Sequence, residues 1–144
     1  MQRLIFNQIT PAKEQSFLPF ALTDIFTEFV HSNHIEIIHF WQLENTFILG
    51  MKDTRTPFVE KGIKKIIEHS YVPVIRNSGG LGVIADEGIL NISYLFPKTA
   101  DSASTDHAYE EMVSLTHQAF PELRIEAYEI ASSYCRGTYD LRVN

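Results

Sequence analysis

The sequence has 144 residues, of which 44% are hydrophobic and 21% charged, with a mean hydropathy of −0.08. This balance is typical of a soluble globular domain, and the length predicts one domain that folds without a metal or disulfide. A net charge of −6 argues against a nucleic-acid binder held by phosphate contacts. The single cysteine excludes an internal disulfide and favours the reducing cytoplasm. No apolar run is long enough for a secretion signal or a membrane span, so we expect no membrane partner.

The N-terminal third predicts a strand, a helix and a hairpin. Leu4–Ile9 is a short apolar run typical of a strand. From Pro19 onward, apolar residues recur at helical spacing, at Leu22, Ile25, Phe26, Phe29 and Val30. Ile35–Leu43 and Thr46–Leu49 are rich in β-branched and aromatic residues, and the dipeptide Glu44-Asn45 separates them. We expect these two runs to pair as a β-hairpin.

A second helix is predicted from Pro57 to about His69, with Thr56 as its N-cap. Its apolar residues fall on one stripe, whereas three lysines lie largely off that stripe: Lys61, Lys64 and Lys65. These lysines form either a solvated face or a surface that meets an acidic protein partner.

The middle of the chain predicts another hairpin and a third helix. Tyr71–Arg76 is expected to be a strand. Val83–Ala85 and Ile89–Phe96 are expected to pair across the turn Asp86-Glu87-Gly88. A helix is then predicted at about Thr105–Phe120.

Two final strands, Arg124–Ile130 and Gly137–Val143, complete an α+β fold with a mixed, mostly antiparallel sheet. Residues 1–144 are expected to form one domain. The chain stops directly after a strand pattern, so the last strand either forms an edge or lacks its natural neighbour. We therefore expect an exposed sheet edge and self-association through it.

The segment Arg76–Gly82 is the first candidate for chemistry. It places a cation beside three glycines in four positions, in the order Arg76, Asn77, Ser78, Gly79, Gly80, Leu81 and Gly82. Such a loop lets the backbone approach an anionic or carbonyl oxygen closely, but it can equally be a tight turn between strands. Neither a Walker A motif nor a dinucleotide-binding fingerprint is present.

Cys135 is the second candidate. It lies in a connection between strands rather than in an apolar run, and Arg136 beside it would favour the thiolate if the two side chains were close. The alternative is an inert buried thiol. Asp140 is placed inside a predicted strand, where aspartate is uncommon, so it faces water or serves a ligand. Asp53 and Asp86 are expected to stabilise turns.

The six histidines lack metal-site spacing: His31, His34, His39, His69, His107 and His117. We expect each to be a surface or capping residue, and no metal to be bound.

Combined spacing gives the chain a family resemblance. Val72–Val83, followed by Asp86-Glu87-Gly88 and Leu90–Ser93, resembles the signature of the lipoate–protein ligase, octanoyltransferase and biotin–protein ligase superfamily. Phe47–Gly50 and Asp53–Arg55 are similar to a strand-and-glycine segment of the same superfamily. The resemblance implies the class-II synthetase-like catalytic fold.

Within the superfamily, Glu129–Leu141 most resembles the octanoyl-[glycine cleavage H protein]:protein N-octanoyltransferase branch. The resemblance implies that Cys135 forms a thioester, and that Arg76, Asn77, Ser78, Gly79 and Gly80 line the acyl or carboxyl pocket with Asp140 nearby. It also implies an octanoylated or lipoylated H protein as the donor and lipoyl domains of 2-oxoacid dehydrogenases as acceptors. No cofactor is needed on this reading.

Family members are about twice as long and carry a lysine-containing segment just beyond the strand that ends near Val143. The chain is therefore expected to be the N-terminal part of the catalytic domain, which leaves its own catalytic competence open. Two alternatives stay in place. One is an ATP-dependent lipoate–protein ligase, in which Cys135 is incidental. The other is a non-catalytic fragment that only binds a lipoyl domain or the missing half.

Overall fold

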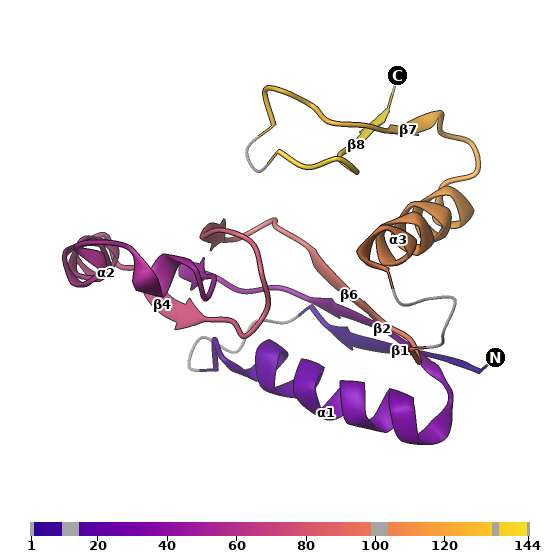
Figure 1. Ribbon diagram of the computed structural model, residues 1–144, viewed down its shortest axis with the longest axis horizontal. Coiled ribbons are helices and arrows are strands. Elements are labelled where there is room, and N and C mark those ends of the chain that lie inside the picture. Colours follow the sequence, from indigo (N-terminus) through magenta and orange to yellow (C-terminus); the bar gives the residue numbers. More distant parts are fainter. Residues whose placement is uncertain (1, 10–14, 99–103, 134–135, 144) are drawn as a thin grey trace. The chain divides into compact units, whose positions relative to one another are not determined.

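The computed structural model describes residues 2–9, 15–98, 104–133 and 136–143 (Figure 1). Two compact units divide the chain, at residues 1–97 and 98–144. Their elements in chain order are β1 (Arg3–Gln8), α1 (Leu18–Asn33), β2 (Glu36–Trp41), β3 (Thr46–Leu49), a 3₁₀ turn (Asp53–Arg55), α2 (Val59–Glu68), β4 (Val72–Ile75), β5 (Val83–Ala85), β6 (Asn91–Leu95), α3 (Thr105–Ala119), β7 (Ile125–Ala127) and β8 (Leu141–Val143).

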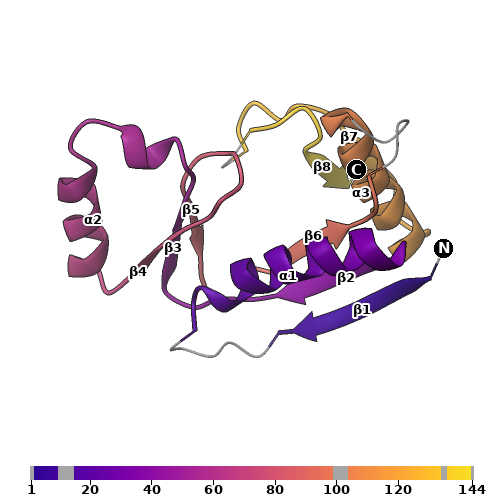
Figure 2. The same cartoon turned by 60° about the horizontal axis from the view of Figure 1, so that its bottom comes forward.

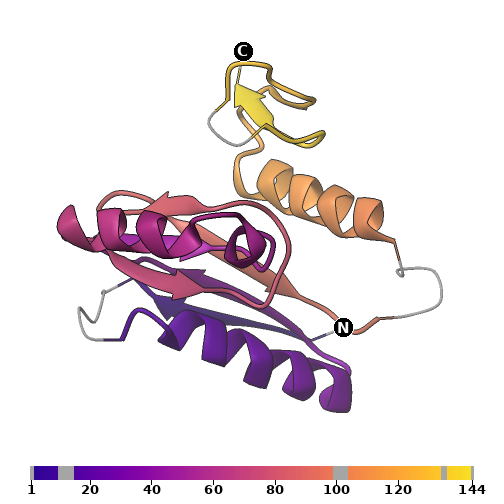
Figure 3. The same ribbon diagram turned by 60° about the vertical axis from the view of Figure 1, so that its left-hand side comes forward.

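The first sheet has the order β1-β2-β6 and is mixed, with β1 parallel and β6 antiparallel to β2. Parallel neighbours need a crossover, which α1 supplies between β1 and β2. The helix runs along one face of this sheet (Figures 1 and 3). Val30 of α1 packs there with Ile35 and Ile37, beside Phe26 and Leu95.

The second sheet has the order β4-β3-β5 and repeats the same plan. β4 is parallel and β5 antiparallel to β3, and α2 forms the crossover and packs against β4 (Figure 2). A second core cluster joins the two sheets and consists of Trp41, Leu43, Ile48 and Ala85, with Phe20 and Val83 packed against it. The expected α+β class and mixed sheet are thus confirmed.

Both predicted hairpins are wrong. β2 and β3 follow one another in sequence but belong to different sheets, and so do β5 and β6. The link after β2 turns away because Thr46 Oγ1 donates to the Glu44 carbonyl (2.8 Å) and the Asn45 N–H donates to Asp86 (3.3 Å). The turn after β5 does form, with the Ile89 N–H 3.1 Å from the Asp86 carbonyl, yet it carries the chain onward to β2.

The helices begin and end close to their predicted bounds, with one correction. Thr56 is not the N-cap of α2, because Phe58 precedes Val59 with a left-handed φ of +64°. Thr56 instead closes the preceding 3₁₀ turn, its Oγ1 donating to the Asp53 carbonyl at 2.7 Å. α3 has a standard cap, in which Ser104 Oγ accepts from the His107 N–H at 3.1 Å.

In the second unit, α3 leads into an antiparallel ribbon of β7 and β8 (Figure 1). β8 begins at Leu141, so Asp140 lies just before the strand. The prediction that Asp140 lies inside a strand is therefore wrong. Among the described residues, β8 pairs with β7 alone.

Candidate functional site

The glycine-rich loop connects β4 and β5 and folds directly over Gly50. A Cβ added at Gly50 would lie 2.2 Å from the carbonyl oxygen of Gly80. Gly80 itself has φ +90°, a conformation that favours glycine. Two backbone segments therefore meet at a distance that no side chain at position 50 allows.

Arg76 holds this loop from within. Its Nη2 donates to the Leu81 carbonyl at 2.9 Å, and its backbone N–H donates to the Leu49 carbonyl at 2.9 Å. Its Nε is buried and has no hydrogen-bond partner among the described residues. The guanidinium thus fixes the loop's far end and keeps a positive charge beneath it.

Of the other predicted loop residues, one is hydrogen-bonded to a helix and two are exposed. Asn77 Nδ2 donates to Asp24 Oδ1 of α1 at 2.7 Å, which ties the loop to the first crossover helix. Ser78 and Gly79 are exposed, and a Cβ at Gly79 would meet no atom within 4 Å. The structure therefore brings Arg76 to Gly80 together as one element with Ser78-Gly79 facing open space.

Two carboxylates stabilise turns before and after the glycine-rich loop. Asp53 Oδ2 accepts from the Gly50 N–H at 2.8 Å, as expected of a turn residue. Asp86 accepts from Tyr71 Oη (2.6 Å) and from the Glu87 N–H (2.9 Å), in addition to Asn45. The Tyr71 hydrogen bond is the main cause that lowers the pKa of Asp86, and the same bond raises the pKa of Tyr71.

Asp140 organises the segment that carries the candidate nucleophile. Its carboxylate accepts from Ser133 Oγ (2.8 Å), the Gly137 N–H (3.1 Å) and the Ile130 N–H (3.2 Å). The Ser133 hydrogen bond is the main cause that lowers the pKa of Asp140. Cys135 lies outside the described residues, but the residues described on either side of it are held by this one carboxylate.

Arg136, the cation expected beside Cys135, is engaged elsewhere. Its Nε lies 3.4 Å from Glu129 Oε1, and both side chains are more than half exposed. An ion pair of this kind contributes little to stability and competes with any attraction between the guanidinium and a thiolate.

His39 contradicts the expectation of a surface or capping residue, because it is fully buried. Its Nε2 lies 3.0 Å from Gln8 Oε1, and its ring meets those of Phe6 and Phe26 edge to face. In β2 the odd-numbered positions are buried and the even-numbered ones half-buried, but apolar residues stand at both kinds of position, so the sequence carried no alternation that could have found it. In the described part of the chain, no three His, Cys, Asp or Glu side chains are placed to hold a metal ion.

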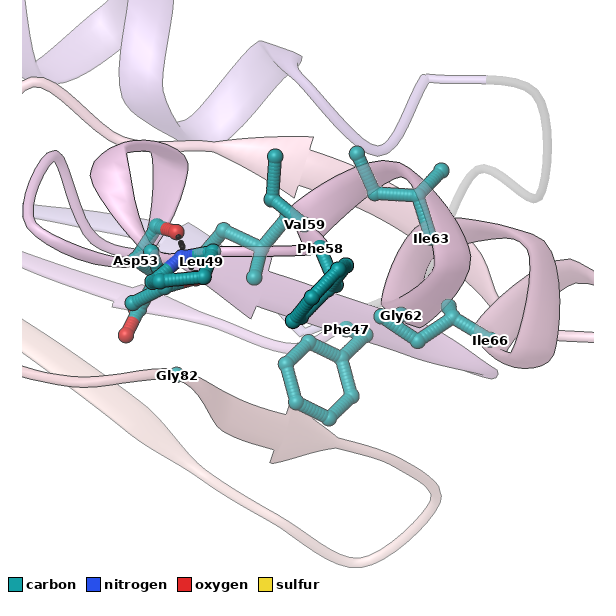
Figure 4. Close-up of a pocket in the computed structure, with 11 residues that line it drawn as sticks. Phe47, Leu49, Asp53, Phe58, Val59, Gly62, Ile63, Ile66 and Gly82 are labelled. Atoms are coloured by element: carbon teal, nitrogen blue, oxygen red, sulfur yellow. Dashed lines mark hydrogen bonds between the residues drawn. The ribbon is translucent and has the colours of Figure 1, made fainter.

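A cavity of about 430 Å³ that the sequence did not reveal lies between α2, β3, the 3₁₀ turn and the end of the glycine-rich loop (Figure 4). The rings of Phe47 and Phe58 both extend into it, and Ile63 and Ile66 of α2 form its apolar wall. Gly82 also lines the cavity, and a Cβ there would lie 2.8 Å from the Phe47 ring, so a side chain at position 82 would crowd that ring. In the parts of the chain that are described, no helix has the length and apolarity to cross a bilayer.

Comparison with known proteins gives consistent results. Residues 15–144 match the family model of the lipoyl protein ligase A/B catalytic domain. The chain is 42% identical to the octanoyl-[GcvH]:protein N-octanoyltransferase of Lysinibacillus sphaericus, over 96% of this chain and 51% of that protein. It is 38% identical to the protein of the same name from Anoxybacillus flavithermus, over 87% of this chain and 46% of that protein.

A crystal structure of lipoate-protein ligase A bound with ATP has the same fold, with a TM-score of 0.68 and 16% identity, over 92% of this chain and 52% of that one. The chain spans about half the length of the curated relatives it matches. With a family match that covers nearly all of its residues, the chain belongs to the lipoyl protein ligase A/B catalytic domain family.

Proposed function

We propose that this chain provides the acyl-accepting part of an octanoyltransferase of the lipoate pathway. Two considerations support it. Relatives that are 38% and 42% identical to the chain have that activity in their names, and Asp140 holds residues on both sides of Cys135. The second consideration carries the proposal, because a nucleophile must be held in position to attack a carbonyl.

In the proposed reaction, the Cys135 thiolate attacks the carbonyl carbon of an octanoyl-lysine amide on GcvH. The C–N bond breaks, the leaving lysine Nζ takes a proton from water, and an octanoyl thioester forms on Sγ. A neutral lysine Nζ of a lipoyl domain then attacks the thioester and loses a proton to water. The C–S bond breaks, and the thiolate is restored. No bond formation in this sequence requires ATP or a metal. A free thiolate of this kind is suited to the reducing cytoplasm.

The residues of the glycine-rich loop have a separate role in this proposal. Ser78 and Gly79, which face open space, line the pocket for the octanoyl group in this proposal. Arg76 holds the loop and supplies a positive field beneath it. Asp140 does not touch substrate and acts as a positioning residue for Cys135.

The test is intact-protein mass spectrometry of the chain after incubation with octanoylated GcvH, without ATP. The expected result is the mass of one octanoyl group, mapped to Cys135 and removed by hydroxylamine, which cleaves thioesters. Cys135→Ala should give no adduct. An adduct that forms only with free octanoate and ATP, and that persists in Cys135→Ser, would replace the proposal with an adenylating ligase. Binding of GcvH without an adduct would make the chain a binding module.

A further inference from the structure

The chain concentrates its positive charge in one short segment. Five of its twelve Lys and Arg residues lie between positions 52 and 65, together with two carboxylates, so this segment carries +3 while the whole chain carries −6. The five side chains are all on exposed residues: Lys52, Arg55, Lys61, Lys64 and Lys65. Charge of this sign on an otherwise acidic chain is suited to an acidic partner.

The same segment borders the cavity beneath α2. Phe58, which is 75% exposed, lines the cavity, and Lys61 Nζ lies 5.0 Å from the centre of its ring. Phe58, Lys61, Gly62 and Lys65 are spaced three or four residues apart, so they form one stripe along the helix. This stripe, named here the α2 stripe, combines an exposed aromatic ring, two cations and the entrance of an apolar cavity.

No contact within the described residues explains why position 62 of the stripe is a glycine. A glycine inside an exposed helix costs about 1 kcal/mol relative to alanine. Its φ is not positive, and a Cβ added there would meet no atom within 4 Å, so neither backbone conformation nor packing within the described residues requires glycine. Gly62 nevertheless lines the cavity. A missing side chain at such a place leaves room for something that approaches the helix closely.

We infer that the α2 stripe is the docking surface for the protein partner that carries the acyl group. An acidic segment of that partner passes over Gly62, and one apolar side chain enters the cavity beside Phe58. The carboxylates of the segment meet Lys61 and compete with Glu68, 2.5 Å from Lys65 Nζ, for Lys65. The inference rests on the proposed function for the identity of the partner. A protein is favoured over a nucleic acid or an anionic membrane because the charge outside the segment is −9, which repels a polyanion.

The test measures binding of octanoylated GcvH to the chain by calorimetry at 50 mM and 500 mM NaCl. Gly62→Ala should raise the melting temperature by a few degrees through helix propensity and yet weaken binding at least fivefold. These opposite signs separate docking from damage to the fold. Gly62→Leu should weaken binding further. Ser32→Ala, in the exposed last turn of α1, is the matched control for helix propensity and should leave binding unchanged.

Charge is tested on two lysines of one helix. Lys61→Glu should weaken binding about tenfold at low salt, whereas Lys64→Glu, on the side of α2 away from Gly62, should have a clearly smaller effect. High salt should reduce the wild-type affinity and narrow the difference between these variants. Amide shifts in an NMR titration with GcvH should cluster at residues 52–66.

Several results would overturn the inference. Two concern GcvH: all variants bind it equally, or the wild-type chain does not bind it. A third is that DNA or phosphatidylserine vesicles bind more tightly than GcvH and respond to the same substitutions. A fourth is that the chain forms a dimer that Gly62→Ala dissociates. The proposed function is tested separately, by the Cys135 adduct at saturating GcvH. An adduct that forms in every variant alongside equal binding rejects this docking surface and leaves the acyl chemistry standing.

Discussion

Gly50 and Gly80 face each other so closely that the carbonyl oxygen of Gly80 occupies the space of a Cβ at position 50. Gly50→Ala should therefore push the glycine-rich loop away from β3. We expect a loss of about 1–3 kcal/mol in the free energy of unfolding, measured by urea denaturation, because neither backbone segment can yield cheaply. The yield of the Cys135 adduct should fall with it.

Gly79→Ala is the matched control for the stability of that variant. A Cβ at position 79 meets no atom within 4 Å, and its φ is not positive. The unfolding free energy should change by less than about 0.5 kcal/mol, as for ordinary surface substitutions. Equal stability of the Gly50 and Gly79 variants would contradict the close approach described above.

Replacement of Asp140 should loosen the segment on both sides of Cys135. Asp140→Ala removes three hydrogen bonds at once, so the amides of Ile130 and Gly137 should exchange with deuterium faster. Asp140→Asn keeps one acceptor oxygen and should give an intermediate rate. Glu122→Gln, at an exposed carboxylate of the same unit, should change neither amide. A normal exchange pattern in Asp140→Ala would remove the positioning role assigned to this carboxylate.

The same carboxylate predicts an acid dependence. Hydrogen bonding lowers the pKa of Asp140 in the folded chain, so its contribution to stability is present above the ordinary aspartate pKa and is lost as pH falls through the lowered value. The amide exchange of Ile130 and Gly137 should therefore accelerate below about pH 4 in the wild-type chain. The exchange rates in Asp140→Asn should lack this acid step.

His39 predicts a second pH effect, nearer neutrality. Burial lowers the pKa of His39, and its Nδ1 has no hydrogen-bond partner among the described residues. The unfolded chain takes up the proton first, so stability is complete above the ordinary histidine pKa of about 6.5 and falls as pH drops toward the lowered folded value. One proton accounts for at most about 1.4 kcal/mol per pH unit. Urea denaturation between pH 7.5 and 5 should show this slope.

The control for His39 is another histidine. His39→Phe should flatten the slope, whereas His69→Gln, at the exposed end of α2, should leave it in place. A slope that survives in His39→Phe would assign the effect to a different group.

The edge of β8 predicts concentration-dependent association. Leu141 and Val143 are 41% and 54% exposed on a strand whose second edge has no neighbour in the described residues. Light scattering after size exclusion should detect dimers at high concentration, and Val143→Lys should reduce them. A monomer at every concentration would contradict this expectation.

The positions of helices and strands were predicted from the sequence far better than the pairing of the strands. Val83–Ala85 was predicted with its observed bounds, and the third helix begins at the predicted Thr105. Apolar periodicity reports which face of an element is buried, and it does so locally. It contains no information on which strand lies alongside, so β2 and β3 were paired by proximity in sequence although each pairs with strands from elsewhere.

The site was predicted only in part, for a related reason. Residues Arg76 to Gly80 were recognisable because their chemistry is contained in one continuous segment. The cavity beneath α2 was not, because its walls come from a helix, a strand, a turn and the glycine-rich loop. Asp140 was wrongly assigned to a strand for a different reason. Its carboxylate accepts hydrogen bonds from Ser133 and Ile130 across a loop, and such bonds leave no periodic pattern in the sequence.

The strand order of the first sheet also limits the order in which the chain can fold during its synthesis. His39 of β2 lies opposite Phe6 on one side and Ser93 on the other. While the polypeptide emerges from the ribosome, β2 can join β1 early, but its other flank must wait until more than fifty further residues have been synthesised. Closure over such long sequence separations is slow. Nascent chains that stall before β6 would display an incomplete sheet, and we expect them to be a preferred target of chaperones that bind exposed strands.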